Sequence, residues 1–530
     1  MSKKKLQVWL PLVFSLVMIA GMFFGFKLHQ EAGGQSMFRR DKRTSLQETL
    51  DLIRNKYVDK VGLDSLQDDA IAEVMNHLDP HSVYIPASDV ASANEELQGN
   101  FEGIGIEFNR FSDTVHVLYV IPGGPSDKAG IRIGDKIIKV DDSSIVYKGL
   151  FNDDIKKLIR GKEGSKVKLT VLRDNTIQFY SVVRGTIPLP SLAATYMVDG
   201  TTGYIKLSKF SESTYREFMQ AMENLKNIGM QKLILDLRDN PGGFVDKATN
   251  IADEFLDGDK LIVYTQGANI PKQEYSAGKE GIFETGKVAV LVDELTASAS
   301  EILTGALQDW DRATIIGRRT YGKGLVQGQY ELHDGSEIRL TIARYYTPSG
   351  RSIQKPYDKG RKIYDDDILD RYHNGELFSA DSIHYSKDQK TYKTKVQKRT
   401  VYGGGGIVPD IFVPMDTSTI SRSVDILYLN GRFSNFVYKY YIDHVTEFDQ
   451  YKTAADFAAR YQNSTDVWNR LVVEALKDSI KLNNIPEIDK RNIQNQIKAY
   501  LARLKWRTQG YYQVANTFDP SIEKAKEILK

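Results

Sequence analysis

The sequence predicts a multidomain protein of mixed structure, combining the α+β and α/β classes. Three observations lead to this prediction. Short apolar runs divided by glycine turns fill residues 101–184, apolar runs alternate with helical patterns in 187–416, and apolar residues recur at three- and four-residue spacing after 416. A length of 530 residues is enough for roughly three or four domains.

The composition is that of an ordinary globular protein, with 41% hydrophobic and 26% charged residues. The 71 basic and 69 acidic residues nearly cancel, so we expect no nucleic-acid partner. The chain has no cysteine. This excludes a disulfide framework, a thiolate metal site, a cysteine nucleophile and a lipid-modified N-terminal cysteine.

Residues 1–30 are interpreted as a cytoplasmic tip and a transmembrane anchor. Three lysines, residues 3–5, precede the nineteen uncharged residues from Val8 to Phe26, and this run is long enough to span a bilayer as a helix. The positive flank should stay in the cytoplasm. The rest of the chain is then expected on the periplasmic or extracytoplasmic side of the cytoplasmic membrane. The alternative is a cleaved signal peptide, with a weak small-x-small site at Ala32 to Gly34.

A small helical region is expected in residues 31–95. Thr44 to Tyr57 has apolar residues at helical spacing and begins with TSLQE, which has the form of a capping box. Asp64 to Leu78 repeats the pattern and ends at LDPHS, where Pro80 breaks the helix.

Residues 96–186 are expected to form a β-domain of short strands and glycine turns. The run GGPSDKAGIRIGD, Gly123 to Asp135, resembles the segment by which a PDZ domain is recognised. That resemblance implies that an extended C-terminal peptide binds as an added strand. Its carboxylate loop corresponds to Gly103, Ile104, Gly105 and Ile106. The alternative is an ordinary β-domain whose glycines only make turns.

Residues 187–416 alternate between strand and helix patterns, which predicts a sheet covered by helices on at least one face. Within this region, 354–400 is polar and rich in tyrosine and is interpreted as an insertion. Residues 417–530 have mostly helical patterns. We interpret them as a helical cap or an oligomerisation arm, which leaves a homo-oligomer open.

The predicted strand KVAVLVDE, Lys287 to Glu294, leads into a strand-to-helix corner, ELTASASEI, in which most side chains are small. A hydroxyl at Ser298 would lie where the amides at the start of a helix converge, and such amides stabilise an oxyanion. The flanking alanines would leave room for a peptide backbone. The alternative is that Ser298 or Ser300 only caps the helix, and this stretch alone favours capping.

A nucleophilic serine needs a base. None of the eight histidines has an obvious local partner, so histidine is an unsupported candidate. Lys323 lies between two glycines in RRTYGKGLVQ, with Gln327 four residues later. A lysine acts as a base only when burial lowers its pKa by two or three units, roughly 3–4 kcal/mol. An amide at Gln327 could hold the amine without adding charge. Taken singly, a lysine like Lys323 and a glutamine like Gln327 are more often surface residues.

The segment from Ala297 to Gln327 closely resembles the signature of the C-terminal processing peptidases, also called tail-specific proteases. The resemblance extends to LDPHS, DLRDNPGG, YYTPSGRSIQ and GIVPD, and covers about 46–414. It includes a PDZ domain before the protease core. The chain departs from the family pattern at Leu295 and Thr296, where Gly-Ser is frequent.

The resemblance implies an acyl-enzyme mechanism with no metal or cofactor. Ser298 is the implied nucleophile, Lys323 the general base and Gln327 the orienting third member. The implied oxyanion hole comes from the backbone N–H of Ala299 and of a glycine in NPGG, Gly242 or Gly243.

The implied function is a membrane-anchored serine endopeptidase that cleaves envelope proteins near their C-termini. Its partners would be protein substrates with free C-termini, and an adaptor protein is left open. Arg160 is a hypothetical relay between the PDZ domain and the core.

Three other functions fit parts of the sequence. A catalytically silent PDZ scaffold does not explain why Ser298, Lys323 and Gln327 are all present at the sequence spacing that catalysis requires. A trypsin-fold protease with a PDZ module has the opposite domain order. Regulated cleavage of one envelope regulator differs only in its biology, and the sequence does not choose.

Overall fold

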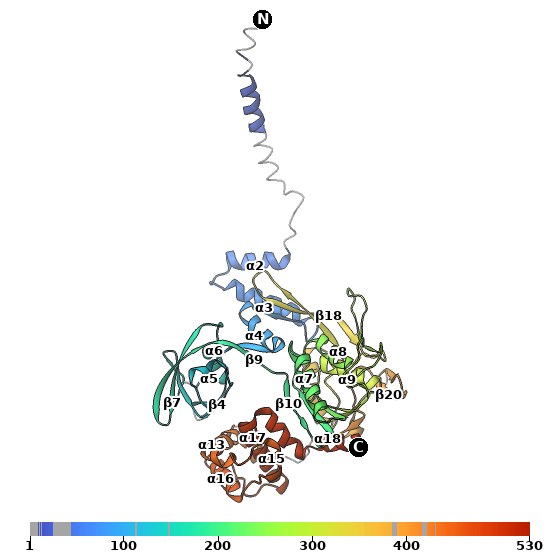
Figure 1. Ribbon diagram of the computed structural model, residues 1–530. Coiled ribbons are helices and arrows are strands. Elements are labelled where there is room, and N and C mark those ends of the chain that lie inside the picture. The colour runs from blue at the N-terminus through green and yellow to red at the C-terminus, as the bar shows by residue number, and fades with distance from the viewer. Residues whose placement is uncertain are drawn as a thin grey trace. The chain divides into compact units, whose positions relative to one another are not determined.

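The computed structural model describes residues 9, 11, 13–24, 44–111, 114–146, 149–383, 389–415, 421–429 and 431–530 (Figure 1). The chain separates into two compact units, residues 1–77 and 78–530. Part of the predicted anchor and the whole of the alternative cleavage site at 32–34 lie outside the described residues. Within the described residues, no helix has both the length and the apolar character needed to cross a membrane.

The first unit contains two amphipathic helices, α2 (Ser45–Lys56) and α3 (Leu63–Asn76). The predicted capping box is present at the start of α2. The Gln47 N–H donates to the Thr44 hydroxyl over 3.4 Å, and the Thr44 N–H donates back to the Gln47 side chain over 3.0 Å. The second unit begins with β1 (Val83–Ile85) and α4 (Ala87–Gln98).

The PDZ-like domain is built on a sheet in the order β3-β4-β5-β7-β8, with β6 paired to β5 and a separate β2-β9 ribbon. Alternation places Val115 and Val117 of β4 in an apolar core with Ile155 and Ile159 of α6. The elements are β2 (Asn100–Gly103), β3 (Ile106–Phe111), β4 (Thr114–Val120), α5 (Pro125–Ala129), β5 (Lys136–Val140), β6 (Ser143–Ser144), α6 (Asn152–Ile159), β7 (Lys166–Arg173), β8 (Thr176–Val183) and β9 (Gly185–Pro188).

The core of the second unit is a six-stranded sheet in the order β10-β11-β12-β15-β16-β21. All neighbours are parallel except β10 and β11. The strands are β10 (Leu192–Met197), β11 (Thr202–Leu207), β12 (Lys232–Asp236), β15 (Lys287–Val292), β16 (Thr314–Gly317) and β21 (Ile411–Phe412). Since parallel strands end at the same edge, the loops after β12, β15 and β16 meet there.

Helices cover both faces of this sheet. α7 (Thr214–Asn227), α8 (Val245–Asp253) and α9 (Ala299–Asp309) pack on the face that carries Leu233 and Leu235. The C-terminal α18 (Pro520–Leu529) packs on the opposite face, against Ile234. Strands buried on both faces explain the continuous apolar runs in their sequences.

A second sheet, in the order β1-β18-β13-β14 with β17 paired to β18, adjoins the core. Its remaining strands are β13 (Leu261–Gln266), β14 (Gln273–Ser276), β17 (Leu325–Glu331) and β18 (Glu337–Tyr346). The register pairs Val83 of β1 with Arg339 of β18, which brings the LDPHS segment to the protease core. The predicted insertion holds α10 (Arg361–Asp365), α11 (Asp367–His373), η1 (Ala380–Ser382), β19 (Thr391–Lys393) and β20 (Thr400–Tyr402).

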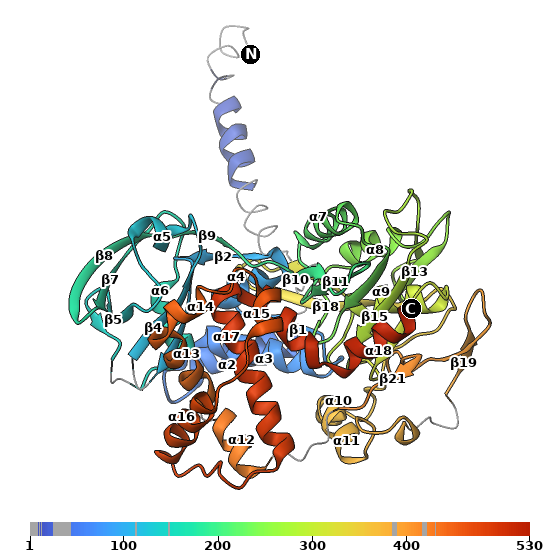
Figure 2. The same ribbon diagram turned by 60° about the horizontal axis from the view of Figure 1, so that its bottom comes forward.

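The C-terminal region is helical and has its own apolar cluster. In Figures 1 and 2 α13 lies beside β4 of the PDZ-like domain. The helices are α12 (Arg422–Leu429), α13 (Arg432–Asp443), α14 (Val445–Phe448), α15 (Ala454–Arg460), α16 (Thr465–Leu476), α17 (Glu487–Ala515) and η2 (Asn516–Phe518). The observed class is therefore a mixed α/β multidomain protein with a helical C-terminal region, as predicted.

Candidate active site

Ser298 lies at a strand–turn–helix corner, between the end of β15 and the first residue of α9. Its backbone has φ 57° and ψ −118°, a strained conformation for a residue with a side chain. Gly242 packs against this corner: a Cβ there would lie 2.7 Å from Cβ of Ser298 and 2.8 Å from N of Ala299. Strain and close packing together fix the backbone that carries the Ser298 side chain.

The carboxylate of Glu301 connects the Ser298 corner to the loop that carries Lys323. The N–H groups of Ser298 and Lys323 each donate to Glu301 Oε2 over 2.9 Å. The Gly322 N–H and the Thr320 hydroxyl donate to Oε1. Glu301 is fully buried, and burial raises its pKa to about 7 although these hydrogen bonds oppose the rise.

A second side chain holds the same two residues through their carbonyls. The hydroxyl of Tyr345, from β18, lies 3.1 Å from the Ser298 carbonyl oxygen and 2.8 Å from that of Lys323. Tyr345 is 1% exposed. Ser298 and Lys323 are therefore tied together at both their N–H and their C=O groups.

Lys323 has the environment that a lysine base requires. Burial lowers the pKa of its ammonium group, and the nearby charge of Arg339 acts in the same direction. The carboxylates of Asp79 and Glu301 oppose this shift. Among the described residues, no side chain, that of Ser298 included, forms a hydrogen bond or ion pair with Nζ of Lys323.

Asp79, from the LDPHS segment, organises the loop beside Lys323. Its Oδ1 accepts from the His81 N–H over 2.9 Å and from the Thr341 hydroxyl over 2.9 Å. His81 Nε2 lies 2.8 Å from the Tyr364 hydroxyl, and burial lowers the His81 pKa to about 3. His81 is neutral at neutral pH, but its ring nitrogen is already paired.

Gln327 does not hold the Lys323 amine directly. Its Nε2 donates to the Thr341 hydroxyl over 3.2 Å, and that hydroxyl donates in turn to Asp79. The expectation of a direct amide–amine hydrogen bond is not met. A β-bulge between Val326 and Gln327 shifts the pairing of β17 with β18 at this point and redirects the side chain.

In the part of the chain that the structure describes, the backbone N–H groups of Ala299 and Gly243 donate no hydrogen bond. Ala299 follows Ser298, and Gly243 follows the glycine that packs against the Ser298 corner. The Gly242 N–H is not available, because it donates to Asn240 Oδ1 over 2.9 Å. Gly243 must be glycine: its φ is 142°, and a Cβ would lie 2.1 Å from the Phe210 carbonyl oxygen. Of the two glycines expected from NPGG, the geometry favours Gly243.

The insertion supports the base loop. Arg371 of α11, 1% exposed, donates to the carbonyls of Thr320 (2.9 Å) and Tyr321 (3.3 Å). The Gly324 N–H donates to the Gln354 side chain over 2.8 Å. These contacts were not foreseen, because a polar, tyrosine-rich segment has no periodicity that reveals what it packs against.

The PDZ residues form the turn between β2 and β3. Gly103 ends β2, Ile104 is buried in the domain core, Gly105 has φ 73°, and Ile106 begins β3. This is the position expected for a carboxylate loop.

Arg160 ends α6 and contacts two residues outside it. Its Nη1 donates to Glu95 of α4 over 2.6 Å, and its guanidinium lies 4.5 Å from the centre of the Phe101 ring. Asn94, the neighbour of Glu95, donates to Glu337 of β18 over 3.0 Å. A continuous set of contacts therefore joins α6 to the strand that carries Tyr345.

Comparison with known proteins decides the family. A model of peptidase family S41 matches residues 201–361, and a PDZ domain model matches 103–182. The carboxy-terminal processing protease CtpA of Bacillus subtilis (strain 168) is 35% identical over 359 residues, which are 67% of this chain and 76% of that protein. This chain belongs to peptidase family S41. It is a serine-type peptidase of the C-terminal processing group.

Other S41 relatives are similar over slightly shorter segments. A probable CtpA-like serine protease of Staphylococcus haemolyticus (strain JCSC1435) is 33% identical over 62% of this chain and 65% of its own length. The structure of a photosystem II D1 C-terminal processing protease is 31% identical, with a TM-score of 0.35, over 58% of this chain and 83% of that one. The C-terminal helices of the S41 peptidase described here, residues 424–507, match a family of unknown function (DUF8443).

Proposed function

We propose that the chain is a membrane-anchored serine endopeptidase that cleaves envelope proteins near or from their C-termini by Ser298–Lys323 catalysis. The observation that carries the mechanism is the double connection of Ser298 and Lys323 through Glu301 and Tyr345. Membership of the C-terminal processing group supports the choice of substrate.

The chemistry follows from the environment of each group. Neutral Lys323 accepts the proton of the Ser298 hydroxyl as Oγ attacks the substrate carbonyl. The oxyanion receives the N–H groups of Ala299 and Gly243, which are fixed before the reaction. Lys323 then gives its proton to the leaving amine, and water hydrolyses the acyl-enzyme with Lys323 again as base. Gln327 acts as a positioning residue through Thr341 and Asp79.

The PDZ domain is proposed to hold the substrate C-terminus at Gly103–Ile106 as a strand added to β3. Arg160 would then relay the bound state through Glu95 and α4 to β18. The test is activation by a peptide substrate: Arg160→Ala should lose activation and keep the basal rate. Normal activation of that variant would remove Arg160 from the account.

The proposed location is the cytoplasmic membrane, with the peptidase on the extracytoplasmic side, based on Val8–Phe26 and its lysine flank. Protease added to intact cells or spheroplasts should degrade the bulk of the chain. A chain that stays protected until the cells are lysed would contradict this topology.

The function is tested by comparing protein C-termini in cells that carry the unaltered chain or Lys323→Ala. In the variant, we expect envelope proteins to keep C-terminal residues that are removed in cells with the unaltered chain. Unchanged C-termini would contradict C-terminal processing. Ser298→Ala assayed on a fluorogenic protein substrate separates the enzyme from a catalytically silent PDZ scaffold, because a scaffold would give the same signal with and without Ser298.

A further inference from the structure

A cavity of about 360 Å³ lies where the PDZ domain meets the C-terminal helices. Its walls come from β3 and α6 on the PDZ side and from α13 and α17 on the helical side. A volume of this size accommodates a few side chains rather than a large ligand. The helices that line it are the part of the chain whose family has no known function.

The cavity opens on the edge of the sheet where a peptide strand would add. In the part of the chain that the structure describes, β3 pairs within its sheet with β4 alone, so its other edge can accept an added strand, although the Arg110 N–H donates to Asn109 Oδ1 over 2.9 Å. Asn152 and Lys156, one helical turn apart on α6, also line the cavity, and the Asn152 side chain donates to Oδ1 of Asn109 on β3 over 3.3 Å. A peptide along β3 would therefore have α6 on one side and α13 and α17 on the other.

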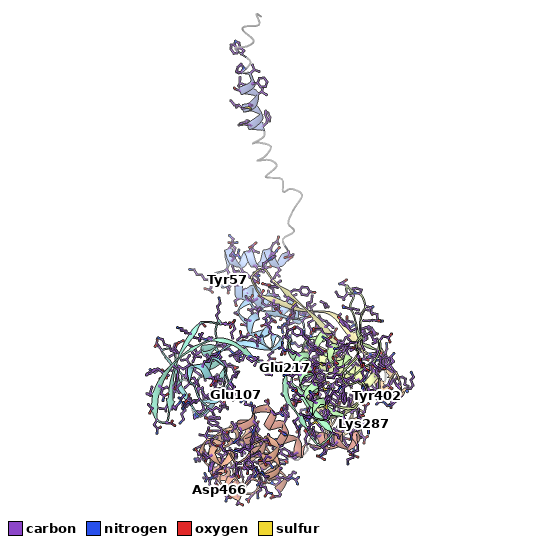
Figure 3. All side chains as sticks on the ribbon, in the orientation of Figure 1. Tyr57, Glu107, Glu217, Lys287, Tyr402 and Asp466 are labelled. Atoms are coloured by element: carbon purple, nitrogen blue, oxygen red, sulfur yellow. The ribbon has the colours of Figure 1, made fainter. Side chains whose placement is uncertain are left out.

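Specific contacts hold the helices in this position. Glu107 of β3 pairs with Arg503 over 2.9 Å and with Arg507 over 2.7 Å, at the place labelled in Figure 3. The Tyr438 ring of α13 stacks on Phe111, with ring centres 5.0 Å apart. The helical region is therefore a fixed wall beside the edge of β3.

Arg507 reaches the PDZ domain because α17 is broken at that point. Its φ of 63° and ψ of −157° are strained for a residue with a side chain. In this conformation, the Arg507 guanidinium lies 3.5 Å from the centre of the Tyr119 ring and also pairs with Glu107. Strain that is retained to direct one cation into a cavity is typical of a binding site.

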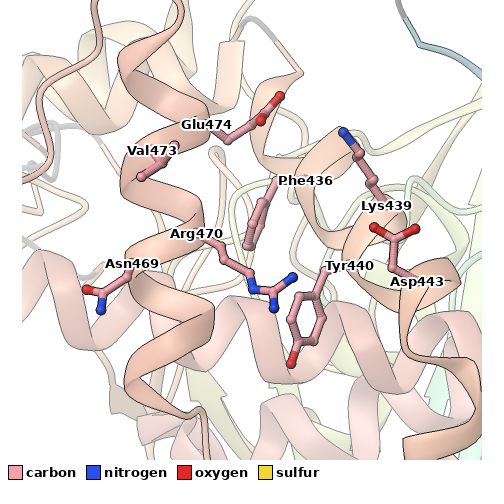
Figure 4. Close-up of a pocket in the computed structure, with 8 residues that line it drawn as sticks. All are labelled: Phe436, Lys439, Tyr440, Asp443, Asn469, Arg470, Val473 and Glu474. Atoms are coloured by element: carbon pink, nitrogen blue, oxygen red, sulfur yellow. The ribbon is translucent and has the colours of Figure 1, made fainter.

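The cavity has an excess of one positive charge. Arg503 and Arg507 line it against the carboxylate of Glu107, and Lys156, which also lines it, is paired with Asp153 over 2.8 Å. A second cavity of about 370 Å³, between α13 and α16 (Figure 4), differs in this respect. There Lys439 and Arg470 are balanced by Asp443 and Glu474.

We propose that the cavity beside β3 is a specificity pocket for an acidic side chain at the residue before the C-terminal residue of a protein substrate. This rests on the proposed binding of substrate C-termini by the PDZ domain. An apolar last side chain would enter the domain interior beside Ile104 and Ile106. Since side chains alternate along a strand, the preceding one points to the opposite side, toward α17.

The occupant is a separate chain rather than α18. That helix is packed against the core sheet, and Leu529 is 2% exposed there.

The test measures peptide affinity by fluorescence anisotropy, using the full chain with Ser298→Ala in mild detergent. Fluorescein-labelled ten-residue peptides end in Glu-Val, Gln-Val or Lys-Val and are otherwise identical. We expect the Glu peptide to bind about five-fold more tightly than the Gln peptide, and the Lys peptide most weakly. Arg503→Gln and Arg507→Gln should each reduce the Glu preference toward one.

Two variants keep the test independent of folding defects. Arg503→Glu should reverse the preference in favour of the Lys peptide, and a misfolded chain cannot produce that gain. Arg470→Gln, in the balanced cavity, should leave the preference unchanged. Equal affinity for the Glu and Gln peptides would overturn the proposed acidic specificity. So would a preference for the Glu peptide that is unchanged in both Arg503→Gln and Arg507→Gln.

An amidated Glu-Val peptide separates this inference from the proposed PDZ function. A free carboxylate that binds better than the amide, with no preference for Glu, overturns the pocket alone. Equal binding of the free and amidated peptides overturns C-terminal recognition, and the pocket with it.

Discussion

The backbone N–H groups of Ser298 and Lys323 donate to the same carboxylate oxygen of Glu301, each over 2.9 Å. The two residues are 25 positions apart in the sequence and follow adjacent parallel strands. Their separation is therefore set by one buried side chain at the N–H groups and by Tyr345 at the carbonyls. Catalysis should respond to changes in either connector even though neither touches the substrate.

Tyr345→Phe removes the hydroxyl between the two carbonyls and keeps the ring. We expect kcat to fall about ten-fold with KM nearly unchanged, because a lost hydrogen bond of about 1 kcal/mol loosens the nucleophile and base. The matched control is Tyr346→Phe, since Tyr346 is the next residue of β18 and stacks on Tyr264 instead. Equal kcat in the Tyr345→Phe and unaltered chains would show that the connection is not needed.

Glu301 should make the stability of the fold depend on pH. Its folded pKa of about 7 lies above the usual 4.5, so between these values the folded chain keeps a proton that the unfolded chain has released. The stability from this group is full below pH 4.5 and is lost as the pH rises through 7.

Comparison with Glu301→Gln isolates this contribution, because glutamine does not titrate. From pH 4 to pH 8, urea unfolding should show the unaltered chain losing roughly 3 kcal/mol relative to the variant. A constant difference between the two chains over this range would mean that Glu301 titrates normally.

Asp79→Asn should move the pH dependence of catalysis. The Asp79 carboxylate opposes the lowering of the Lys323 pKa, so its removal leaves more neutral lysine at a given pH. The pH at half-maximal kcat/KM on the acid side should therefore fall. Asp334→Asn, in the exposed turn before β18, is the control and should leave the pH at half-maximal kcat/KM unchanged. A shift to higher pH after Asp79→Asn would contradict the assignment of Lys323 as the base.

Arg371→Met tests whether the insertion supports the base loop. The variant leaves buried carbonyls of Thr320 and Tyr321 without their donor, which should cost about 2–3 kcal/mol locally and lower kcat. Arg361→Met, on the neighbouring α10, changes a half-exposed side chain and should have little effect. Full activity in Arg371→Met would make the insertion a peripheral feature.

Much of the fold could be predicted because its elements have clear periodicity. The strand predicted from Lys287 to Glu294 is β15, which ends two residues earlier, and the helical pattern from Thr44 to Tyr57 is α2, Ser45–Lys56. Ser298 and Lys323 could be singled out as candidates, since their motifs lie within continuous segments.

The parts that sequence reasoning missed depend on contacts between distant segments. Asp79 reaches Lys323 only because β1 pairs with β18, more than 200 positions away. Glu301 follows Ser298 by three positions, but its carboxylate also holds the distant loop of Lys323. Gln327 was expected to hold the amine, but a one-residue bulge in β18, opposite Val326 and Gln327, pairs Gln327 with Thr341 instead.

The central claim is that Lys323 activates Ser298 for nucleophilic attack. The most direct measurement is the rate and position of labelling by a fluorophosphonate probe at pH 8, followed by peptide mapping. We expect the label on Ser298 in the unaltered and Ser300→Ala chains, and labelling at least a hundred-fold slower in Lys323→Ala. A label on another residue, or an unchanged rate in Lys323→Ala, would contradict the claim.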